Sequence, residues 1–252
     1  MMNVFQTIAV AFAMFSAIPC PQPVWTEKNM RYAMAAFPLV GFLCWAAVAL
    51  WALVGDRAGF GPLLTGAGLA LAPVVVTGGI HLDGFCDTTD ALASHAPRER
   101  KLEILKDSHC GAFAVIATGS YLVFLTAVYG ELRPAGAQLQ ALGLSFVLSR
   151  ALSGFAVTTF PCAKDSGLAK TFSSMAARRQ ARTVLLATAV AAAAGMAALG
   201  AIWAVLAALA MLGIYHAMAR RVFGGITGDL AGWFLQWCEL LMPVAVLLTE
   251  RL

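Results

Sequence analysis

The amino-acid sequence predicts an all-α, polytopic integral membrane protein with seven or eight transmembrane helices. Of its 252 residues, 60% are hydrophobic and only 12% are Asp, Glu, Lys or Arg, which is about half the usual ~25% of soluble proteins. Apolar runs long enough for a membrane span, ~20 residues, recur along the chain. Because no 40-residue stretch lacks such a run, we expect residues 1–252 to form a single transmembrane domain.

The apolar runs give the expected helices in chain order. They are Val4–Pro19, Ala33–Val54, Leu63–Ile80, Ala112–Tyr129, Ala135–Phe160, Val184–Gly200, Ala201–Met218 and Ala231–Leu248. The 35 residues from Val184 to Met218 are too long for one span, and Gly200 is a suitable place for a turn between two helices. The first run is short, so it is either a tilted span or a helix that lies in the membrane interface.

Positive charge is distributed unevenly between alternate loops. Of the 17 Lys and Arg residues, three lie in one set of loops, one (Arg150) lies within an apolar run, and thirteen lie in the other set. These thirteen occupy Pro21–Arg31, Leu82–Gly111, Lys164–Arg182 and the segment before Ala231. The positive-inside rule places these Lys- and Arg-rich loops in the cytoplasm. The net charge of +4 is too small to indicate nucleic-acid binding.

Three aspartates form the densest acidic group in the sequence. Asp83, Asp87 and Asp90 are spaced i, i+4 and i+7, which places their carboxylates on one face of a helix. Like charges at this spacing repel, and the group follows an apolar run, where a bound cation would relieve the repulsion. Oxygen ligands favour Mg²⁺ or Mn²⁺. The pattern therefore predicts a metal site, and the alternative is a solvated acidic face.

Two glycines and a histidine precede this group of aspartates. Gly78 and Gly79 either end the preceding helix or allow the backbone to approach a phosphate. His81 is either a ligand of substrate or phosphate or a hydrogen-bonded structural residue. Both alternatives remain open from the sequence alone.

A second polar segment lies at the start of the next apolar run. Lys106 and His109 could neutralise phosphate oxygens, and Asp107 could bind metal or act as a base. Alternatively, Asp107 or Ser108 caps the helix that follows. The two interpretations are compatible with each other.

A third polar segment, Gly224–Asp229, precedes the last apolar run. A glycine-rich turn that leads into a helix can present backbone N–H groups to an anion, and Asp229 can also cap the helix. Glu239 lies ten residues further on, inside the run. A carboxylate there needs a partner, and Arg150, the basic residue within the fifth run, is the candidate.

These motifs, in this order and at these positions between the predicted membrane spans, resemble those of the cobalamin synthase family. The matching residues are Gly-Gly-x-His-x-Asp-Gly-x-x-Asp-x-x-Asp at Gly78–Asp90, Lys-Asp-Ser-x-x-Gly at Lys106–Gly111, and Gly-Gly-x-Thr-Gly-Asp at Gly224–Asp229. The resemblance extends over nearly the whole chain. It implies an all-helical enzyme of the bacterial inner membrane that joins adenosylcobinamide-GDP to α-ribazole or its 5′-phosphate. It further implies that GMP is released and that Mg²⁺ is required.

The resemblance and the residue chemistry together define an expected site on the cytoplasmic face. The expected catalytic residues are Asp83, Asp87, Asp90 and Asp107, of which the first three are also the expected Mg²⁺ ligands. The expected substrate-binding residues are His81, Lys106, Ser108, His109, Arg150, Lys164, Thr227, Asp229 and Glu239. The expected partners are the two substrates and the lipid bilayer, with a homo-oligomer left open.

Two other functions remain as alternatives. One is a phospholipid-forming enzyme like the CDP-alcohol phosphotransferases, although the chain lacks the Asp-Gly-x-x-Ala-Arg start of their motif. The other is an ion-coupled transporter, although the acids gather at one membrane border and not at the midplane, where transporters bind their substrates. Product analysis distinguishes the three functions: release of GMP favours the synthase, release of CMP favours the phospholipid-forming enzyme, and release of neither favours the transporter.

Overall fold

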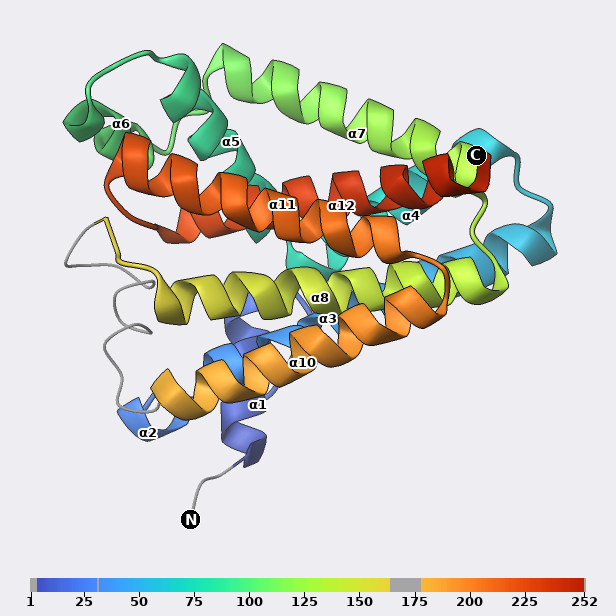
Figure 1. Cartoon of the computed structure of the whole chain (residues 1–252), viewed down its shortest axis with the longest axis horizontal. Helices are drawn as coiled ribbons and strands as arrows, with labels where there is room; N and C mark the ends of the chain where they lie inside the picture. The colour runs from blue at the N-terminus through green and yellow to red at the C-terminus, as the bar shows by residue number, and fades with distance from the viewer. Residues whose placement is uncertain (1–3, 31, 164–177, 252) are drawn as a thin grey trace.

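A computed structural model of the chain describes residues 4–30, 32–163 and 178–251, which form an elongated helical bundle (Figure 1). The helices are α1 (Val4–Phe15), α2 (Glu27–Met30), α3 (Ala33–Ala58), α4 (Pro62–Thr77), α5 (Ile80–Ala93), α6 (Arg98–Ile104), α7 (Ala112–Leu132), α8 (Gly136–Thr159), α10 (Arg178–Ala198), α11 (Ile202–Met218), η1 (Ala219–Phe223) and α12 (Gly228–Arg251). Within these residues, the β-structure is limited to one isolated parallel bridge between Cys162 and Ile226. The all-α prediction is confirmed.

Six of the described helices, namely α3, α7, α8, α10, α11 continued by η1, and α12, are long and apolar enough to cross a membrane. The bent pair of α4 and α5 makes a seventh if it counts as one span. The resulting total of seven candidate spans equals the lower end of the predicted range of seven to eight transmembrane helices. The 12 residues of α1 extend roughly 18 Å at 1.5 Å per residue, well short of a ~30 Å hydrocarbon core. Its length therefore favours the interfacial alternative for the first apolar run.

The third apolar run is broken at its two glycines. Gly78 and Gly79 have φ angles of +63° and +78°, which glycine adopts without the strain of a side chain. Their N–H groups donate to the carbonyls of Val75 at 3.3 Å and Val74 at 2.9 Å, and so satisfy the C-terminal end of α4. The chain then leaves as α5 at an angle of 97°. The helix-capping interpretation of these glycines is therefore correct.

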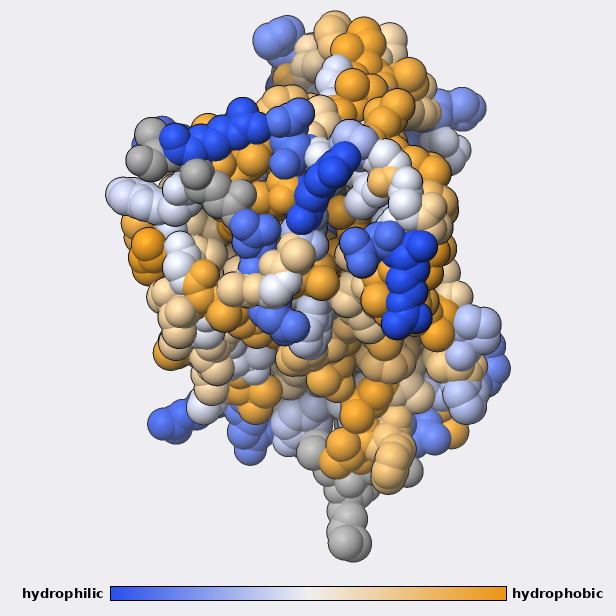
Figure 2. All heavy atoms as spheres, turned by 90° about the vertical axis from the view of Figure 1, so that its right-hand side faces the viewer, coloured by the Kyte–Doolittle hydropathy of each residue, from blue (hydrophilic) through white to orange (hydrophobic). Residues whose placement is uncertain are grey.

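The segments rich in Lys and Arg and those poor in them lie at opposite ends of the bundle. α2, α6, the start of α10 and η1 lie at the left-hand end in Figure 1, whereas the turns after α3, α7 and α10 lie at the right-hand end. Figure 2 views the right-hand end and shows hydrophilic side chains in separate patches among apolar ones. This arrangement matches the alternating charge pattern on which the topology prediction rests.

α8 lies at the centre of the bundle and carries much of its core. It packs against α3, α10 and α12, and 16 of its 24 residues are buried. At the turn that follows α10, Gly200 has φ +82°, which confirms the predicted break between the two helices of the long apolar stretch. The core thus orients the helices so that α5, α7 and α12 bring their polar ends together at the Lys- and Arg-rich end (Figure 1).

Candidate active site

The first and third polar motifs meet where α5 crosses α12. A Cβ atom on Gly84 would lie 2.7 Å from the carbonyl oxygen of Asp229, and one on Gly232 would lie 3.0 Å from the carbonyl oxygen of His81. The first distance is too short for a real Cβ contact, and the second is shorter than most such contacts. Glycine at these two positions therefore allows the two backbones to approach this closely. The contact brings Asp229 beside the aspartates of α5, which lie 139 to 146 residues earlier in the chain.

Five aspartates gather at this crossing, and we call Asp83, Asp87, Asp90, Asp107 and Asp229 the acidic cluster. The carboxylate of Asp87 is within electrostatic range of the other four. Its members come from α5, from the loop between α6 and α7, and from the first turn of α12. Their exposure differs: Asp83 and Asp107 are exposed, and Asp87 and Asp90 are half-buried. The structure therefore joins the three sequence motifs into one acidic region at the Lys- and Arg-rich end.

Asp90 also has a structural role that the sequence analysis missed. Its Oδ2 accepts the Gly111 N–H at 2.6 Å, and its Oδ1 accepts the Ala114 N–H at 2.9 Å. These amides belong to Gly111, the N-cap residue of α7, and to Ala114 in its first turn, where helix N–H groups have no partner within the helix. The expectation that Asp107 or Ser108 caps this helix is wrong, because the cap comes from α5. A contact across 21 residues leaves no signal in the local sequence.

The described residues contain no group of three or more His, Cys, Asp or Glu side chains arranged to hold a metal ion. The three-aspartate metal site therefore stays a prediction. The oxygen chemistry of the acidic cluster suits Mg²⁺, which is commonly held by one or two carboxylates together with substrate phosphates and waters. Asp83 and Asp87 fit such an ion better than Asp90, whose two oxygens already accept hydrogen bonds from α7.

The loop before α7 presents a carboxylate–imidazole pair. Asp107 Oδ1 lies 2.7 Å from His109 Nδ1 and also accepts the backbone N–H of His109 at 3.0 Å. Both side chains are largely exposed, at 53% and 89%. The two hydrogen bonds favour the ionised carboxylate and lower the pKa of Asp107 below its ordinary value. Lys106 and Ser108 are exposed beside this pair, so this loop offers charged and hydroxyl groups to solvent or substrate.

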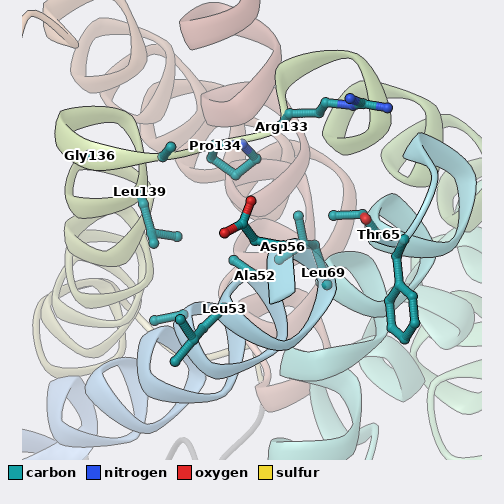
Figure 3. A pocket seen from close by; sticks show the side chains of 13 residues that line it. Ala52, Leu53, Asp56, Thr65, Leu69, Arg133, Pro134, Gly136 and Leu139 are labelled. Carbon is teal, nitrogen blue, oxygen red and sulfur yellow. The ribbon is translucent and has the colours of Figure 1, made fainter. Parts of the chain in front are cut away.

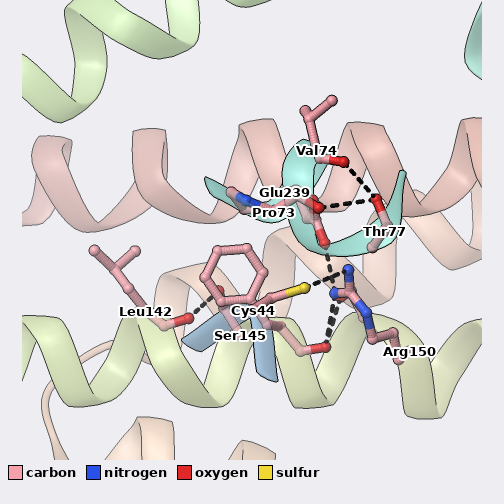
Figure 4. A network of polar contacts seen from close by, with 10 residues as sticks. Cys44, Pro73, Val74, Thr77, Leu142, Ser145, Arg150 and Glu239 are labelled. Atoms are coloured by element: carbon pink, nitrogen blue, oxygen red, sulfur yellow. Dashed lines mark hydrogen bonds and ion pairs between the residues drawn. The ribbon is translucent and has the colours of Figure 1, made fainter. Parts of the chain in front are cut away.

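Arg150 and Glu239 form an ion pair inside the bundle (Figure 4). Arg150 Nη1 lies 2.5 Å from Glu239 Oε1, and the two side chains are 0% and 4% exposed. The guanidinium also donates to the carbonyl of Phe146 at 3.1 Å and to Cys44 Sγ at 3.3 Å. The predicted partnership between Arg150 and Glu239 is confirmed. Their predicted contact with substrate stays a prediction that this burial disfavours.

The glycine-rich segment before α12 packs against the end of α8. Gly225 N–H donates to the carbonyl of Ala219 at 3.0 Å, and Ile226 N–H donates to that of Pro161 at 2.9 Å. These two amides are therefore already bonded, contrary to the expectation that this turn presents its N–H groups to an anion. Thr227 caps α12, because its Oγ1 accepts the Leu230 N–H at 3.2 Å. Its hydroxyl also lies 3.3 Å from the Asp229 carboxylate.

A cavity of about 150 Å³ adjoins the acidic cluster. Asp83 and Asp229 are part of its lining, together with His81 and the aromatic rings of Phe15 and Phe37. His81 is 7% exposed, and its Nε2 atom has no hydrogen-bond partner among the described residues. The two phenylalanines belong to the first two apolar runs, where nothing distinguishes them from other core residues. These two rings could therefore not be recognised as part of a site from the sequence alone.

A larger cavity of about 360 Å³ lies at the opposite end of the bundle (Figure 3). Its lining includes Asp56 at the end of α3 and Arg133 and Pro134 in the turn between α7 and α8, with the Asp56 carboxylate pointing toward that turn. None of the predicted site residues lines it. The predicted site residues that the structure brings together are therefore those around the acidic cluster, and Lys164 lies outside the described residues.

Comparisons with known proteins connect this site to one family. A family model described as cobalamin-5-phosphate synthase matches residues 7–247. An adenosylcobinamide-GDP ribazoletransferase of Lachnoclostridium phytofermentans is 39% identical, with 99% of this chain and 96% of that protein covered. Proteins with the same name from Desulfitobacterium hafniense and Clostridium perfringens are 33% and 31% identical over more than nine-tenths of each chain. No solved structure matches.

Proposed function

This chain belongs to the cobalamin-5-phosphate synthase family, and we propose that it joins adenosylcobinamide-GDP to α-ribazole or α-ribazole 5′-phosphate with release of GMP. The observation that carries this proposal is the acidic cluster, in which motifs from α5, the α6–α7 loop and α12 converge beside a cavity. Such a convergence of like charges at a membrane border suits a site that binds cations together with phosphates.

The proposed reaction is a phosphoryl transfer. A hydroxyl of the acceptor attacks the phosphorus next to cobinamide, a new P–O bond forms, and the P–O bond to the bridging oxygen breaks. GMP leaves with the electron pair of that bond, and the hydroxyl proton passes to a base. Bound Mg²⁺ would supply positive charge to the pyrophosphate and to the leaving phosphate. Asp83 and Asp87 are the residues that would hold it, with Asp229 opposite them on α12.

The residues of the α6–α7 loop would act on the two substrates directly. Lys106 would place its ammonium group beside the pyrophosphate oxygens, where it offsets their negative charge. Asp107 holds the Nδ1 side of the His109 imidazole at 2.7 Å, which leaves Nε2 as the nitrogen that can accept a proton. Either Asp107 or His109 would therefore take the proton of the attacking hydroxyl, and Asp107 orients the ring in the second case.

Product analysis tests the proposal. The purified protein in proteoliposomes would be supplied with adenosylcobinamide-GDP, α-ribazole and Mg²⁺, and GMP and the joined corrinoid product would be measured. We expect equal amounts of both products. Omission of α-ribazole should abolish GMP release, which controls for hydrolysis. No GMP with both substrates present would overturn the proposal, and release of CMP from a CDP-alcohol would favour the phospholipid-forming alternative.

We further propose that the acidic cluster faces the cytoplasm of the bacterial inner membrane. Its support is the count in the sequence of thirteen Lys and Arg residues in one set of loops, against three in the alternate set. Single cysteines at exposed Ser94 and exposed Ala135, in a variant without native cysteines, would report the two ends. In intact cells, an impermeant thiol reagent should label position 135 and not position 94. The reverse pattern would overturn the cytoplasmic assignment.

A further inference from the structure

The cavity beside the acidic cluster has aromatic and aliphatic walls. The ring centroids of Phe15 and Phe37 lie 4.5 Å apart, and that of Phe37 lies 5.5 Å from the His81 ring. Met34 and Val157 extend the apolar lining. The volume is about 150 Å³, and an apolar protein cavity of about that volume binds benzene. The cavity is thus of the size for a small aromatic ring system and far too small for a corrinoid.

His81 provides an unsatisfied polar group at this apolar site. Its side chain is more than nine-tenths buried, and its Nε2 atom has no hydrogen-bond partner in the described part of the chain. A buried polar atom without a partner is unfavourable. A ligand that brought one complementary nitrogen would remove this penalty, and a flat nitrogen heterocycle offers such an atom in the plane of its ring.

The position of the cavity sets the direction in which a ligand would extend. Its lining includes Asp229 and the exposed Asp83, both members of the acidic cluster, so the cavity is continuous with the proposed site of phosphoryl transfer. A nucleoside has an aromatic base at one end and ribose hydroxyls at the other. With its base in the cavity, its ribose would lie beside the carboxylates.

We propose that this cavity is the subsite for the heteroaromatic base of the acceptor nucleoside. The base packs against Phe15 and Phe37, and His81 Nε2 forms a hydrogen bond with a ring nitrogen. This inference rests on the proposed function and adds to it the place of one substrate. It assigns His81 to the base of the acceptor, where the sequence alone left a ligand, a phosphate and a structural role open.

The guanine of the donor substrate suits the same cavity poorly. Its ring edge carries several hydrogen-bond donors and acceptors, whereas the cavity wall away from the carboxylates offers only the polar side chains of His81 and Ser153 among aliphatic and phenyl groups. Burial of guanine there would leave some of these donors and acceptors without hydrogen-bond partners. Because unpaired buried polar groups are costly, such a cavity binds guanine weakly. A base with one acceptor nitrogen and otherwise apolar edges matches the single unsatisfied nitrogen of His81.

The substitution His81→Phe tests the hydrogen bond, because it keeps a ring and removes the nitrogens. We expect the KM for α-ribazole to rise about tenfold, the effect of one lost hydrogen bond, and the KM for adenosylcobinamide-GDP to stay unchanged. α-Ribazole alone should raise the melting temperature of the unmodified protein and not that of the variant. His81→Gln retains a hydrogen-bonding group and should restore part of both effects.

Three further variants separate an effect on the cavity from general effects on folding. Val157→Phe would fill the cavity from α8 and should weaken α-ribazole binding, whereas Val123→Phe changes a residue that is 72% exposed and outside the cavity and should change nothing. His216→Phe is the control for loss of a histidine, since His216 packs against Phe160 at a centroid distance of 4.3 Å. It should leave both KM values unaltered.

The possible outcomes distinguish this inference from the proposed function. Variants that raise the KM for adenosylcobinamide-GDP, and not for α-ribazole, would show that the cavity holds the donor and would overturn the inference. Unchanged KM values and unchanged stabilisation by α-ribazole would overturn it as well. If the unmodified protein forms no product, but α-ribazole stabilises it and not His81→Phe, the base subsite stands and the proposed reaction fails.

Discussion

Two groups of charged side chains in the same bundle differ in how their charges are balanced. Arg150 and Glu239 have opposite charges, lie 2.5 Å apart and are almost fully buried. The acidic cluster consists of like charges, is partly exposed and lies at one end of the bundle. In the first group, the opposite charges neutralise each other inside the protein. The second brings together groups that repel one another and that a cation or a cationic side chain would stabilise.

This difference separates a structural from a functional use of charge in an apolar protein. A buried ion pair satisfies its own charges, and loss of one partner leaves the other unpaired in a medium of low dielectric constant. Like carboxylates at a membrane border contribute no such stabilisation by themselves, so their assembly points to binding or catalysis. We therefore expect substitutions in the pair to act mainly on stability and substitutions in the cluster to act mainly on turnover.

The largest expected effect concerns the buried pair. Arg150→Met should lower the free energy of unfolding by about 3–5 kcal/mol, because the Glu239 carboxylate would stay buried without its partner. Denaturation in mixed detergent micelles, followed by circular dichroism, would measure this change.

The double variant Arg150→Met, Glu239→Leu is the matched control. Removal of both charges should recover most of the lost stability, since buried pairs are often replaceable by apolar residues at little cost, and the double-mutant cycle isolates their coupling. If Arg150→Met instead retained full stability and lost turnover, Arg150 would belong to the substrate site, and the proposed division between the two groups would fail.

The next effect concerns catalysis by the acidic cluster. Asp83→Asn and Asp87→Asn should each lower turnover at least ~10²-fold, a barrier increase of about 2.7 kcal/mol, because the amide keeps the size of the side chain and removes its charge. Unfolding free energies should change little, since Asp83 is exposed and Asp87 half-buried. Release of GMP from adenosylcobinamide-GDP in the presence of α-ribazole would measure the effect.

Metal removal provides an independent check on the same residues. EDTA should abolish turnover of the unmodified protein, and Mg²⁺ or Mn²⁺ should restore it, as carboxylate and phosphate oxygens favour these ions. Asp56→Asn, at the other end of the bundle, is the control and should leave turnover and its response to Mg²⁺ unchanged. Near-normal, EDTA-insensitive activity in both cluster variants would identify the cluster as a solvated acidic surface.

Asp90 combines both uses of charge. Its two oxygens accept N–H groups from the first turn of α7, and an amide offers only one oxygen for these two donors. Asp90→Asn should therefore lower the unfolding free energy by about 1–2 kcal/mol, the effect of a lost helix cap, in addition to its effect on turnover. A stability equal to that of Asp87→Asn would show that the cap contributes nothing.

The sequence predicted the membrane fold and part of the site for identifiable physical reasons. Each span is encoded by its own apolar run, and the partnership of Arg150 with Glu239 follows from the cost of leaving either charge unpaired in such a run. The cap by Asp90 was not predictable, because Asp107 and Ser108 offer a nearer cap and tertiary packing decides between them. Phe15 contributes to the cavity through the same packing, far from the motifs in sequence.

The smallest expected effect concerns the exposed pair of Asp107 and His109. The two hydrogen bonds from His109 lower the pKa of Asp107, so this carboxylate stays ionised to a lower pH than an ordinary aspartate, and the contacts are lost as the pH falls through the lowered pKa. His109→Ala keeps the backbone N–H bond to Asp107 and removes the bond from the ring, so it should raise this pKa part of the way toward its ordinary value. Stability should change little, because both side chains are largely exposed. Carbon-13 NMR titration of the aspartate carboxyl groups in detergent would measure both values. If the Asp107 titration were the same with and without the His109 ring, the pair would not persist in solution, and His109 would lose its proposed orientation by Asp107.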